Sequence, residues 1–261
     1  NAGHVQIWED WDAQAQTSHA IEYLKSRDTA NPFCLFLSWG PPHHPYRLAP
    51  QKYLDMYDPN AIQGRPNCPN VPREDLWGYY AQTTFLDDQF QRLLNVLDEL
   101  EITENTIVVF SSDHGDMHGS HGLYKKQWPW NEAIKIPFVI RYPGRVAGGQ
   151  EIGAPINVID IMPTLLGLTG LPVPDAVEGV DLSAYLTGVR DDPPESVLIM
   201  NPCPFSIGDT RGYDQYPDYK GERLEYRGVI TERYTYVRTI DRPWLLYDNL
   251  KDPYQLDNLI D

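Results

Sequence analysis

Two hydrophobic periodicities alternate along the chain, and their alternation predicts an α/β protein. Apolar side chains spaced three and four residues apart predict a helix over Thr17–Ser26 and a longer amphipathic helix over Leu76–Leu100. Short continuous apolar runs, typical of strands covered on both faces, occupy Phe33–Trp39, Thr106–Phe110 and Phe138–Arg141. We therefore expect a mainly parallel sheet that contains all three strands and is flanked by helices.

The pattern changes after Thr187. Turn-forming residues dominate Pro202–Lys220, and apolar and polar residues then alternate in two segments before a short apolar run. These three segments are Tyr226–Thr231, Tyr234–Thr239 and Trp244–Tyr247. They predict a small antiparallel sheet. The sequence thus predicts an α/β domain over residues 1–187 and a small C-terminal α+β subdomain over residues 188–261.

Composition narrows the classes of partner. The 261 residues include 21 Lys and Arg against 37 Asp and Glu, a formal net charge of −16. Because an acidic surface repels phosphate backbones, we do not expect nucleic-acid binding. No apolar run approaches the ~20 residues that a membrane-spanning helix needs, so we do not expect a membrane-embedded chain. The cysteines, Cys34, Cys68 and Cys203, allow at most one disulfide and leave the redox compartment open.

Candidate metal ligands follow the predicted strand that ends at Phe110. Ligands of α/β sheets bind beyond the carboxyl ends of strands, and Asp113 and His114 stand at that position. A carboxylate oxygen and a neutral imidazole nitrogen both suit a divalent cation. The alternative is a polar surface loop that happens to contain several histidines.

Two further candidates are weaker by themselves. His43 and His44 lie among prolines just after a predicted strand, where a stiff backbone could aim an imidazole at a leaving group or an anion. Their alternative role is to cap backbone groups of a proline-rich loop. Lys125 and Lys126 follow the metal-like loop and could bind an oxyanion as a point charge, or form an ordinary solvated pair.

Taken together, these segments resemble the sulfatase family of the alkaline-phosphatase superfamily. The resemblance runs in order along nearly the whole chain. It is carried by Pro41–Tyr57, Gly78–Asp88, Ser111–Lys126, Ile136–Gly144, Asn157–Pro172 and Leu246–Leu259. Each piece is weak alone, but their common order is hard to obtain by chance. The resemblance implies an alkaline-phosphatase-like α/β fold and favours a periplasmic or extracellular location.

The resemblance implies a role for each matching residue. Asp113 and His114 match the pair that ligates a divalent cation, usually Ca²⁺. Lys126 matches the lysine that contacts the sulfate, with Lys125 as the substitute if the loop is shifted by one residue. His121 is placed near the substrate pocket without a firm role.

The same resemblance assigns the leaving-group side of the site. His43 matches the histidine near the ester oxygen that departs, and His44 is its substitute. We expect His43 to converge with Asp113, His114 and Lys126 on one cavity.

Two family motifs are not found in this sequence. One is the C/S-x-P-S-R motif whose first residue becomes formylglycine, and the other is an Asp-Asp pair that completes the metal site. Cys68–Arg73 contains a Cys and an Arg but has the wrong spacing and no Ser. The simplest account is that the chain is the C-terminal part of a longer sulfatase with formylglycine upstream. By itself the chain is then expected to be inactive and to expose apolar surface.

The resemblance thus implies hydrolysis of a sulfate ester carried by a small molecule or a carbohydrate. The hydrated formylglycine would attack sulfur with help from the metal, Lys126 and His43. A phosphodiester or phosphonate monoester hydrolase of the same superfamily is the nearest alternative. A non-catalytic pseudo-enzyme domain on the same fold is the other.

Overall fold

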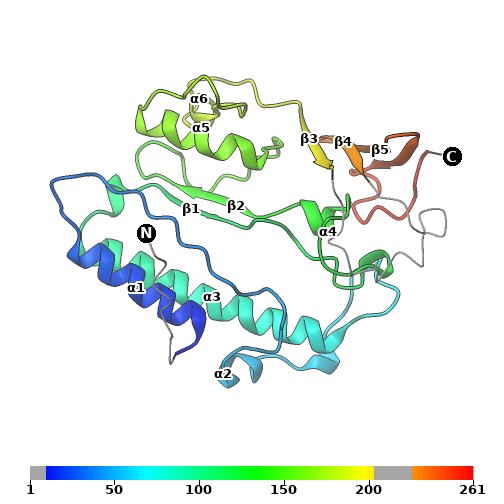
Figure 1. Cartoon of the computed structure of the whole chain (residues 1–261), viewed down its shortest axis with the longest axis horizontal. Helices are drawn as coiled ribbons and strands as arrows, with labels where there is room; N and C mark the ends of the chain where they lie inside the picture. The colour runs from blue at the N-terminus through cyan, green and yellow to red at the C-terminus, as the bar shows by residue number, and fades with distance from the viewer. Residues whose placement is uncertain (1–9, 203–224, 261) are drawn as a thin grey trace. The chain divides into compact units, whose positions relative to one another are not determined.

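The structure is a computed structural model that describes residues 10–202 and 225–260 (Figure 1). Its α-helices are α1 (Asp12–Ser26), α2 (Gln51–Leu54), α3 (Arg73–Glu99), α4 (Asn131–Ile134), α5 (Val158–Thr169) and α6 (Ser183–Leu186). Its 3₁₀ helices are η1 (Pro59–Ala61), η2 (Thr103–Asn105) and η3 (Ser120–Gly122). Its strands are β1 (Val108–Ser111), β2 (Phe138–Arg141), β3 (Ser196–Asn201), β4 (Tyr226–Thr231), β5 (Tyr234–Thr239) and β6 (Pro243–Asp248).

The chain divides into two compact units. Unit 1 contains Asn1–Gly64 and Val71–Thr106, and unit 2 contains Arg65–Asn70 and Ile107–Asp261. The predicted domain boundary between residues 187 and 188 stays a prediction. Of the predicted Pro202–Lys220 loop, all but the first residue lies outside the described residues. In the described part of the chain, no helix combines the length and the apolar character needed to cross a membrane.

Helices α1 and α3 pack against each other in unit 1. Ala13 of α1 is fully buried, and Phe85 of α3, 2% exposed, belongs to the same apolar cluster. Burying a side chain of this size stabilises a fold by roughly 1.5–3 kcal/mol. The guanidinium of Arg92 on α3 also donates to the hydroxyl of Ser18 on α1 at 2.9 Å. Both predicted helices are thereby confirmed, with α1 starting earlier, at Asp12.

The predicted strand over Phe33–Trp39 is wrong for this structure. The segment carries no strand assignment, and the side chain of Phe36 is 91% exposed. It is tied instead to α1, through the Trp39 indole N–H, which donates to Thr17 Oγ1 at 3.1 Å. A continuous apolar run marks a segment that needs covering, but a strand also requires a partner strand, and the described residues provide none here.

The predicted parallel arrangement of the other two strands is also wrong. β1 pairs with β2 in the antiparallel direction, with Val109 opposite Ile140. Parallel neighbours are usually joined by a crossover helix, whereas the connection between β1 and β2 contains only η3 and the four-residue α4. The chain therefore returns beside β1 in reverse. The mainly parallel sheet is not present in the described residues.

The C-terminal antiparallel sheet is confirmed, and β3 adds a fourth strand to it. The order is β3-β4-β5-β6, with every neighbouring pair antiparallel. Alternation places Val237 and Leu245, 0% and 3% exposed, on the face that packs on Trp128 and Trp130. This packing makes the sheet the support for the segment that precedes α4.

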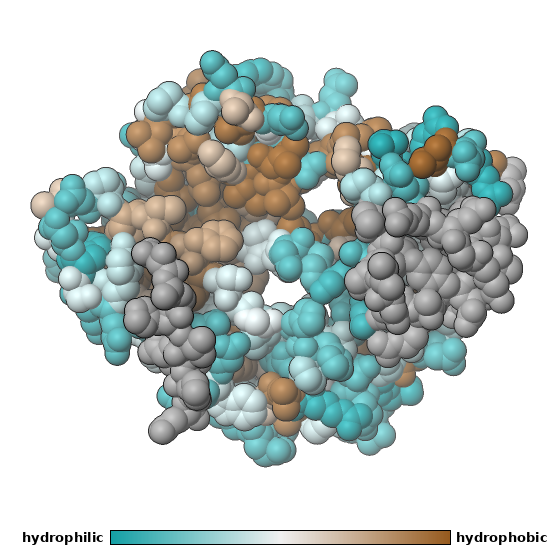
Figure 2. Space-filling view, in the orientation of Figure 1, coloured by the Kyte–Doolittle hydropathy of each residue, from teal (hydrophilic) through white to brown (hydrophobic). Residues whose placement is uncertain are grey.

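A second group of apolar side chains in unit 2 faces outward. Val158, Ile159 and Met162 on α5 are each more than half exposed, as is Val139 on β2. Figure 2 shows hydrophobic residues gathered over the region that α5 occupies in Figure 1. The expectation that this chain exposes apolar surface is confirmed for these residues.

Candidate active site

The loop that carries the predicted metal ligands is held firmly inside unit 2. The Gly115 N–H donates to the Ala133 carbonyl of α4 at 2.8 Å, and the His121 N–H donates to the Asn67 carbonyl at 2.7 Å. Met117 and Leu123 within the loop are fully buried. The loop from Asp113 to Lys126, called the Asp113–Lys126 loop below, is thus a packed element rather than a free surface loop.

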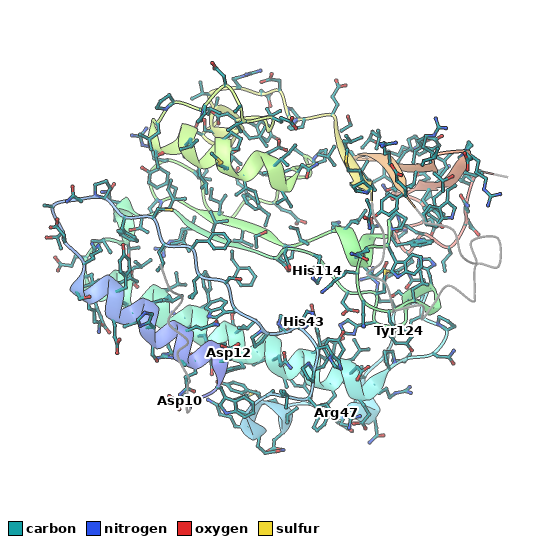
Figure 3. All side chains as sticks on the ribbon, viewed as in Figure 1. Asp10, Asp12, His43, Arg47, His114 and Tyr124 are labelled. Atoms are coloured by element: carbon teal, nitrogen blue, oxygen red, sulfur yellow. The ribbon has the colours of Figure 1, made fainter. Side chains whose placement is uncertain are left out.

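The side chains of Asp113 and His114 lie next to each other. His114 Nδ1 lies 2.7 Å from the Gly115 carbonyl oxygen, which can only accept, so Nδ1 carries the hydrogen. In the neutral ring, Nε2 then holds a lone pair, and Asp113 Oδ2 lies 3.3 Å from it. The Asp113 side chain is 84% exposed. Its neighbour His114 is labelled in Figure 3. A lone pair and a carboxylate oxygen at this distance suit a shared cation.

These two side chains fit one part of a divalent-cation site. A backbone carbonyl that fixes the imidazole tautomer is a common support for a metal-ligating histidine. Among the described residues, however, no group of three or more His, Cys, Asp or Glu side chains could hold a metal ion. A hard cation such as Ca²⁺ takes 6–8 ligands, so Asp113 and His114 provide a minority of them.

The loop folds back so that Lys125 lies beside Asp116. The Lys125 N–H donates to Asp116 Oδ1 at 3.1 Å, and the Met117 N–H donates to the Lys125 carbonyl at 2.8 Å. Lys125 holds φ +62°, a conformation rare for residues other than glycine, and both Lys125 and Lys126 are half-buried. The structure therefore places the two lysines on the same folded loop as Asp113 and His114.

His121 takes part in a buried contact of the same loop. Its ring packs on Trp130 with centroids 5.2 Å apart, and Nε2 lies 3.1 Å from Asn67 Nδ2. Burial lowers the pKa of the His121 imidazole below its ordinary value. The placement of His121 near the substrate pocket stays a prediction.

His43 and His44 lie in unit 1, in an exposed turn between α1 and α2 (Figure 3 shows His43). His43 Nδ1 lies 2.8 Å from the His44 carbonyl, so in the neutral ring Nδ1 carries the hydrogen and Nε2 the lone pair. The His44 ring meets the Tyr46 ring edge-on at 5.5 Å. The convergence of His43 with Asp113, His114 and Lys126 stays a prediction.

Helix α3 anchors the residues that follow these histidines. The amide nitrogen of Gln82, a residue only 1% exposed, donates to the Pro45 carbonyl at 2.9 Å and to the Tyr46 carbonyl at 2.6 Å. A Cβ at Gly78 would stand 2.4 Å from the Tyr46 oxygen, so glycine permits the close approach. Sequence reasoning missed Gln82, although its place one helical turn from Tyr79 and Leu86 on the apolar face is a usable signal.

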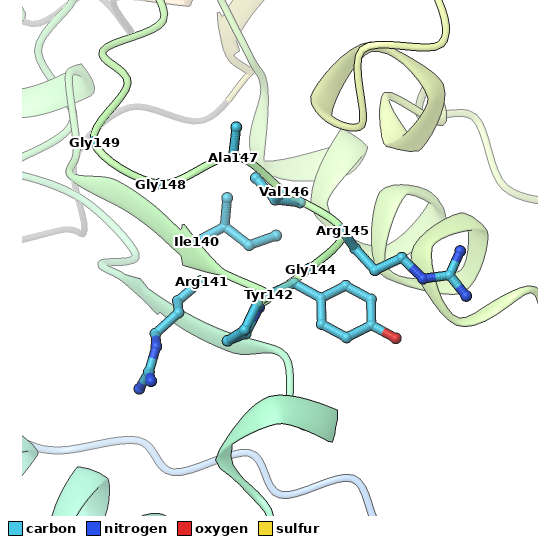
Figure 4. Close-up of a pocket in the computed structure, with 10 residues that line it drawn as sticks. Ile140, Arg141, Tyr142, Gly144, Arg145, Val146, Ala147, Gly148 and Gly149 are labelled. Atoms are coloured by element: carbon cyan, nitrogen blue, oxygen red, sulfur yellow. The ribbon is translucent and has the colours of Figure 1, made fainter.

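A cavity lies at the end of β2, and its lining contains none of the predicted site residues. About 680 Å³ in volume, it is lined by the consecutive residues from Ile140 to Gly149. Its two cations, Arg141 and Arg145, point away from each other in Figure 4. The cavity is therefore the hollow of one loop, and none of the predicted site residues lines it.

Comparison with known proteins identifies the family. The sulfatase family model matches residues 7–171. The ulvan-active sulfatase of Formosa agariphila is 41% identical over 264 residues, which cover 98% of this chain. The chain belongs to the sulfatase family. The resemblance to sulfatases of the alkaline-phosphatase superfamily is thereby confirmed.

Solved structures agree with the fold of this sulfatase chain. A Bacteroides fragilis protein described as a sulfatase has a TM-score of 0.82, with 29% identity, and covers 97% of the chain. The phosphonate monoester hydrolase of Agrobacterium radiobacter has a TM-score of 0.77, with 24% identity, over 93% of the chain, which shows a shared fold. The sulfatase chain spans 49% of the Formosa protein and 55% of each solved chain, or about half their length.

Proposed function

We propose that this chain forms part of a longer enzyme that hydrolyses a sulfate ester. The observation that carries the proposal is the arrangement of Asp113 and His114 in a chain of the sulfatase family, with the His114 Nδ1 bonded to a carbonyl and its Nε2 3.3 Å from the Asp113 carboxylate. The half-length coverage of the relatives supports a longer protein. The remaining metal ligands and a formylglycine nucleophile belong to the proposal and would come from outside these residues.

Asp113 Oδ2 and His114 Nε2 would hold the cation, preferably Ca²⁺ because a carboxylate oxygen is a hard ligand. When bound, the cation would supply positive charge next to the sulfate oxygens. The Gly115 carbonyl places the hydrogen of the neutral His114 ring on Nδ1, which leaves a lone pair on Nε2, and backbone hydrogen bonds hold the loop that carries both residues. These residues therefore preorganise the site before substrate arrives.

Lys126, or Lys125 if the loop is shifted by one residue, would place a further positive charge next to the sulfate. Sulfate carries its charge on several oxygens throughout transfer, so fixed cations are the main way to stabilise the reaction. His43 would donate a proton from Nε2 to the departing alkoxide oxygen. Its Nδ1 contact with the His44 carbonyl suits that role, because this hydrogen bond is kept when the ring is protonated.

We propose a sulfated small molecule or carbohydrate as the substrate. The name of the Formosa relative says that the relative acts on ulvan. The alternative is a phosphodiester or phosphonate monoester, since the Agrobacterium hydrolase shares the fold and a phosphoryl group would suit the same cations.

The experiment compares turnover of 4-nitrophenyl sulfate with that of a phosphodiester and a phosphonate monoester by the complete protein. We expect sulfate to be preferred, and Lys126→Ala to lower kcat/KM for sulfate by about 100-fold or more, the usual effect of removing a group that stabilises transferred charge. Lys135→Ala is the matched control, because Lys135 is exposed in the same unit. Preference for either phosphorus ester would favour the alternative, and no turnover at all would favour a pseudo-enzyme.

A further inference from the structure

A buried asparagine contacts the Asp113–Lys126 loop twice. Asn67 is 5% exposed and lies far before the loop in sequence, within the short Arg65–Asn70 segment that belongs to unit 2. Its backbone carbonyl accepts the His121 N–H at 2.7 Å, and its side-chain Nδ2 lies 3.1 Å from His121 Nε2. One residue therefore grips both the backbone and the ring of His121.

The neighbours of Asn67 fix the orientation of its side-chain amide. Nδ2 lies 2.9 Å from Glu132 Oε1 and 2.9 Å from the Tyr254 carbonyl oxygen. Neither of these oxygens can donate when Glu132 is ionised, so a reversed amide would set Oδ1 against two acceptors. Asn67 Oδ1 is buried, and the described residues offer it no donor, so reversal would gain nothing.

This orientation determines the protonation of His121. Nδ2 has no lone pair to accept with and shares its two hydrogens among the Glu132 and Tyr254 oxygens and His121 Nε2, so Nε2 must be an acceptor and the neutral ring must carry its hydrogen on Nδ1. A protonated ring would set an N–H against an N–H. Burial also lowers the pKa of His121, an effect that Arg65 reinforces and that the carboxylates of Glu132 and Asp252 oppose.

The loop depends on such external contacts because its backbone is strained. Within the loop, His118, His121 and Lys125 hold positive φ, at 42°, 53° and 62°. Residues other than glycine persist in this region only where the surrounding structure imposes it. Asn67 contacts one of these strained residues, His121, directly, and His121 precedes Lys125 and Lys126 in the loop.

We propose that Asn67 is a positioning residue, whose carbonyl and side-chain amide hold His121 and so fix the conformation of the Asp113–Lys126 loop. The consequence for sulfate hydrolysis rests on the proposed function, because it requires that Lys126 contact the sulfate. The coupling of Asn67 to His121 and to the loop backbone does not require this. The two parts can therefore be tested separately.

Hydrogen–deuterium exchange of the complete protein tests the hold on the loop. We expect Asn67→Ala to speed exchange of the loop amides by about tenfold, because it removes a buried hydrogen-bond donor. The control is Asn70→Ala, since Asn70 is exposed in the same segment. His121→Gln supplies another neutral acceptor and should keep the loop protected. Equal exchange in the Asn67 and Asn70 variants would overturn the proposal.

Titration of histidines labelled with ¹³C, followed by NMR, tests the hold on the ring and decides the question if Asn67→Ala fails to fold. We expect His121 to titrate below the ordinary value in the unmodified protein. Asn67→Asp should raise the pKa of His121, because a carboxylate then faces Nε2, whereas Asn70→Asp should leave it unchanged. A His121 that titrates alike in all three proteins would overturn the coupling.

Turnover of 4-nitrophenyl sulfate adds the catalytic consequence. We expect kcat/KM to fall about 10–100-fold in Asn67→Ala, the usual effect of removing a support behind a site residue. A loosened loop with unchanged turnover would overturn the positioning role in catalysis. An unmodified protein that leaves the aryl sulfate intact would count against the proposed function alone, since the exchange and titration results stand without it.

Discussion

The backbone of Gly115 packs directly against the carbonyl group of Glu132. A Cβ on Gly115 would overlap that carbonyl oxygen, and the neighbouring Gly115 N–H donates to Ala133 at 2.8 Å. Helix α4 therefore forms the floor beneath the segment that carries Asp113 and His114. Because both partners are backbone, neither can swing aside to admit a side chain.

Gly115→Ala should therefore destabilise the protein and displace the metal-ligand segment. We expect a loss of about 1–3 kcal/mol, typical of overpacking, and a Tm lower by about 2–4 °C per kcal/mol. Thermal unfolding followed by circular dichroism measures the change. The control is Gly148→Ala, because a Cβ at Gly148 meets nothing within 4 Å. Equal melting temperatures for the two variants would contradict the close packing.

Gln82→Met should disturb the turn that carries His43 and His44. The substitution keeps the side-chain size but removes the donor that Gln82 gives to the Pro45 and Tyr46 carbonyls. An unsatisfied buried acceptor costs about 1–3 kcal/mol. We expect urea unfolding at a lower concentration for Gln82→Met and no change for Gln91→Met, an exposed position on the same helix. A shift shared by both variants would point to helix propensity instead.

Tyr226 should make the protein lose stability at alkaline pH. The residue is 4% exposed, and burial raises the pKa of its phenol above the ordinary value of 10.0. The unfolded chain then releases this proton first, so the stabilisation is complete below about pH 10 and declines as pH rises further. We expect a loss of about 1.4 kcal/mol per pH unit in that range.

Urea unfolding at pH 7 and pH 11 measures this decline. Tyr226→Phe should reduce the difference between the two pH values, since phenylalanine has no proton to lose. Tyr234→Phe removes a phenol that is 39% exposed in the same sheet and should leave the difference as it was. An alkaline loss that persists in Tyr226→Phe would assign it to another group.

Local patterns predicted those elements whose stability comes from their own neighbours. The helical spacing of apolar residues up to Leu100 predicted α3, and the alternation of apolar and polar residues predicted β4 and β5. Helix faces and hairpin strands form between residues that lie close together in the sequence. Phe33–Trp39 failed because the pattern records apolar character and not the presence of a partner strand. Whether an apolar run becomes a strand depends on a partner strand from another part of the fold.

Some residues of the candidate site could be predicted from the sequence and others could not, for the same reason. Asp113 and His114 stood out because their side-chain chemistry is visible in the sequence after a strand. Asn67 did not, because its role comes from a carbonyl and an amide that meet His121 only after folding. Supports that act through backbone groups leave no residue-type signal.

The last prediction concerns metal binding. Asp113 and His114 offer two ligand atoms, whereas Ca²⁺ takes 6–8, so this chain by itself should bind Ca²⁺ weakly or not at all. The complete protein should bind it tightly, because we propose that further carboxylates come from outside these residues. Asp113→Ala in the complete protein should abolish tight binding, while Asp175→Ala, at an exposed position in the same unit, should not.

Calorimetric titration of both proteins with Ca²⁺ measures these affinities directly. In the complete protein, bound Ca²⁺ should also raise Tm, since a ligand of the folded state alone stabilises by about 2.7 kcal/mol at 100 times its Kd. EDTA should remove this increase, and Asp113→Ala should show none. Micromolar binding by the 261-residue chain that depends on Asp113 would show that the ligand set is complete within these residues, and the proposal of missing carboxylates would then be wrong.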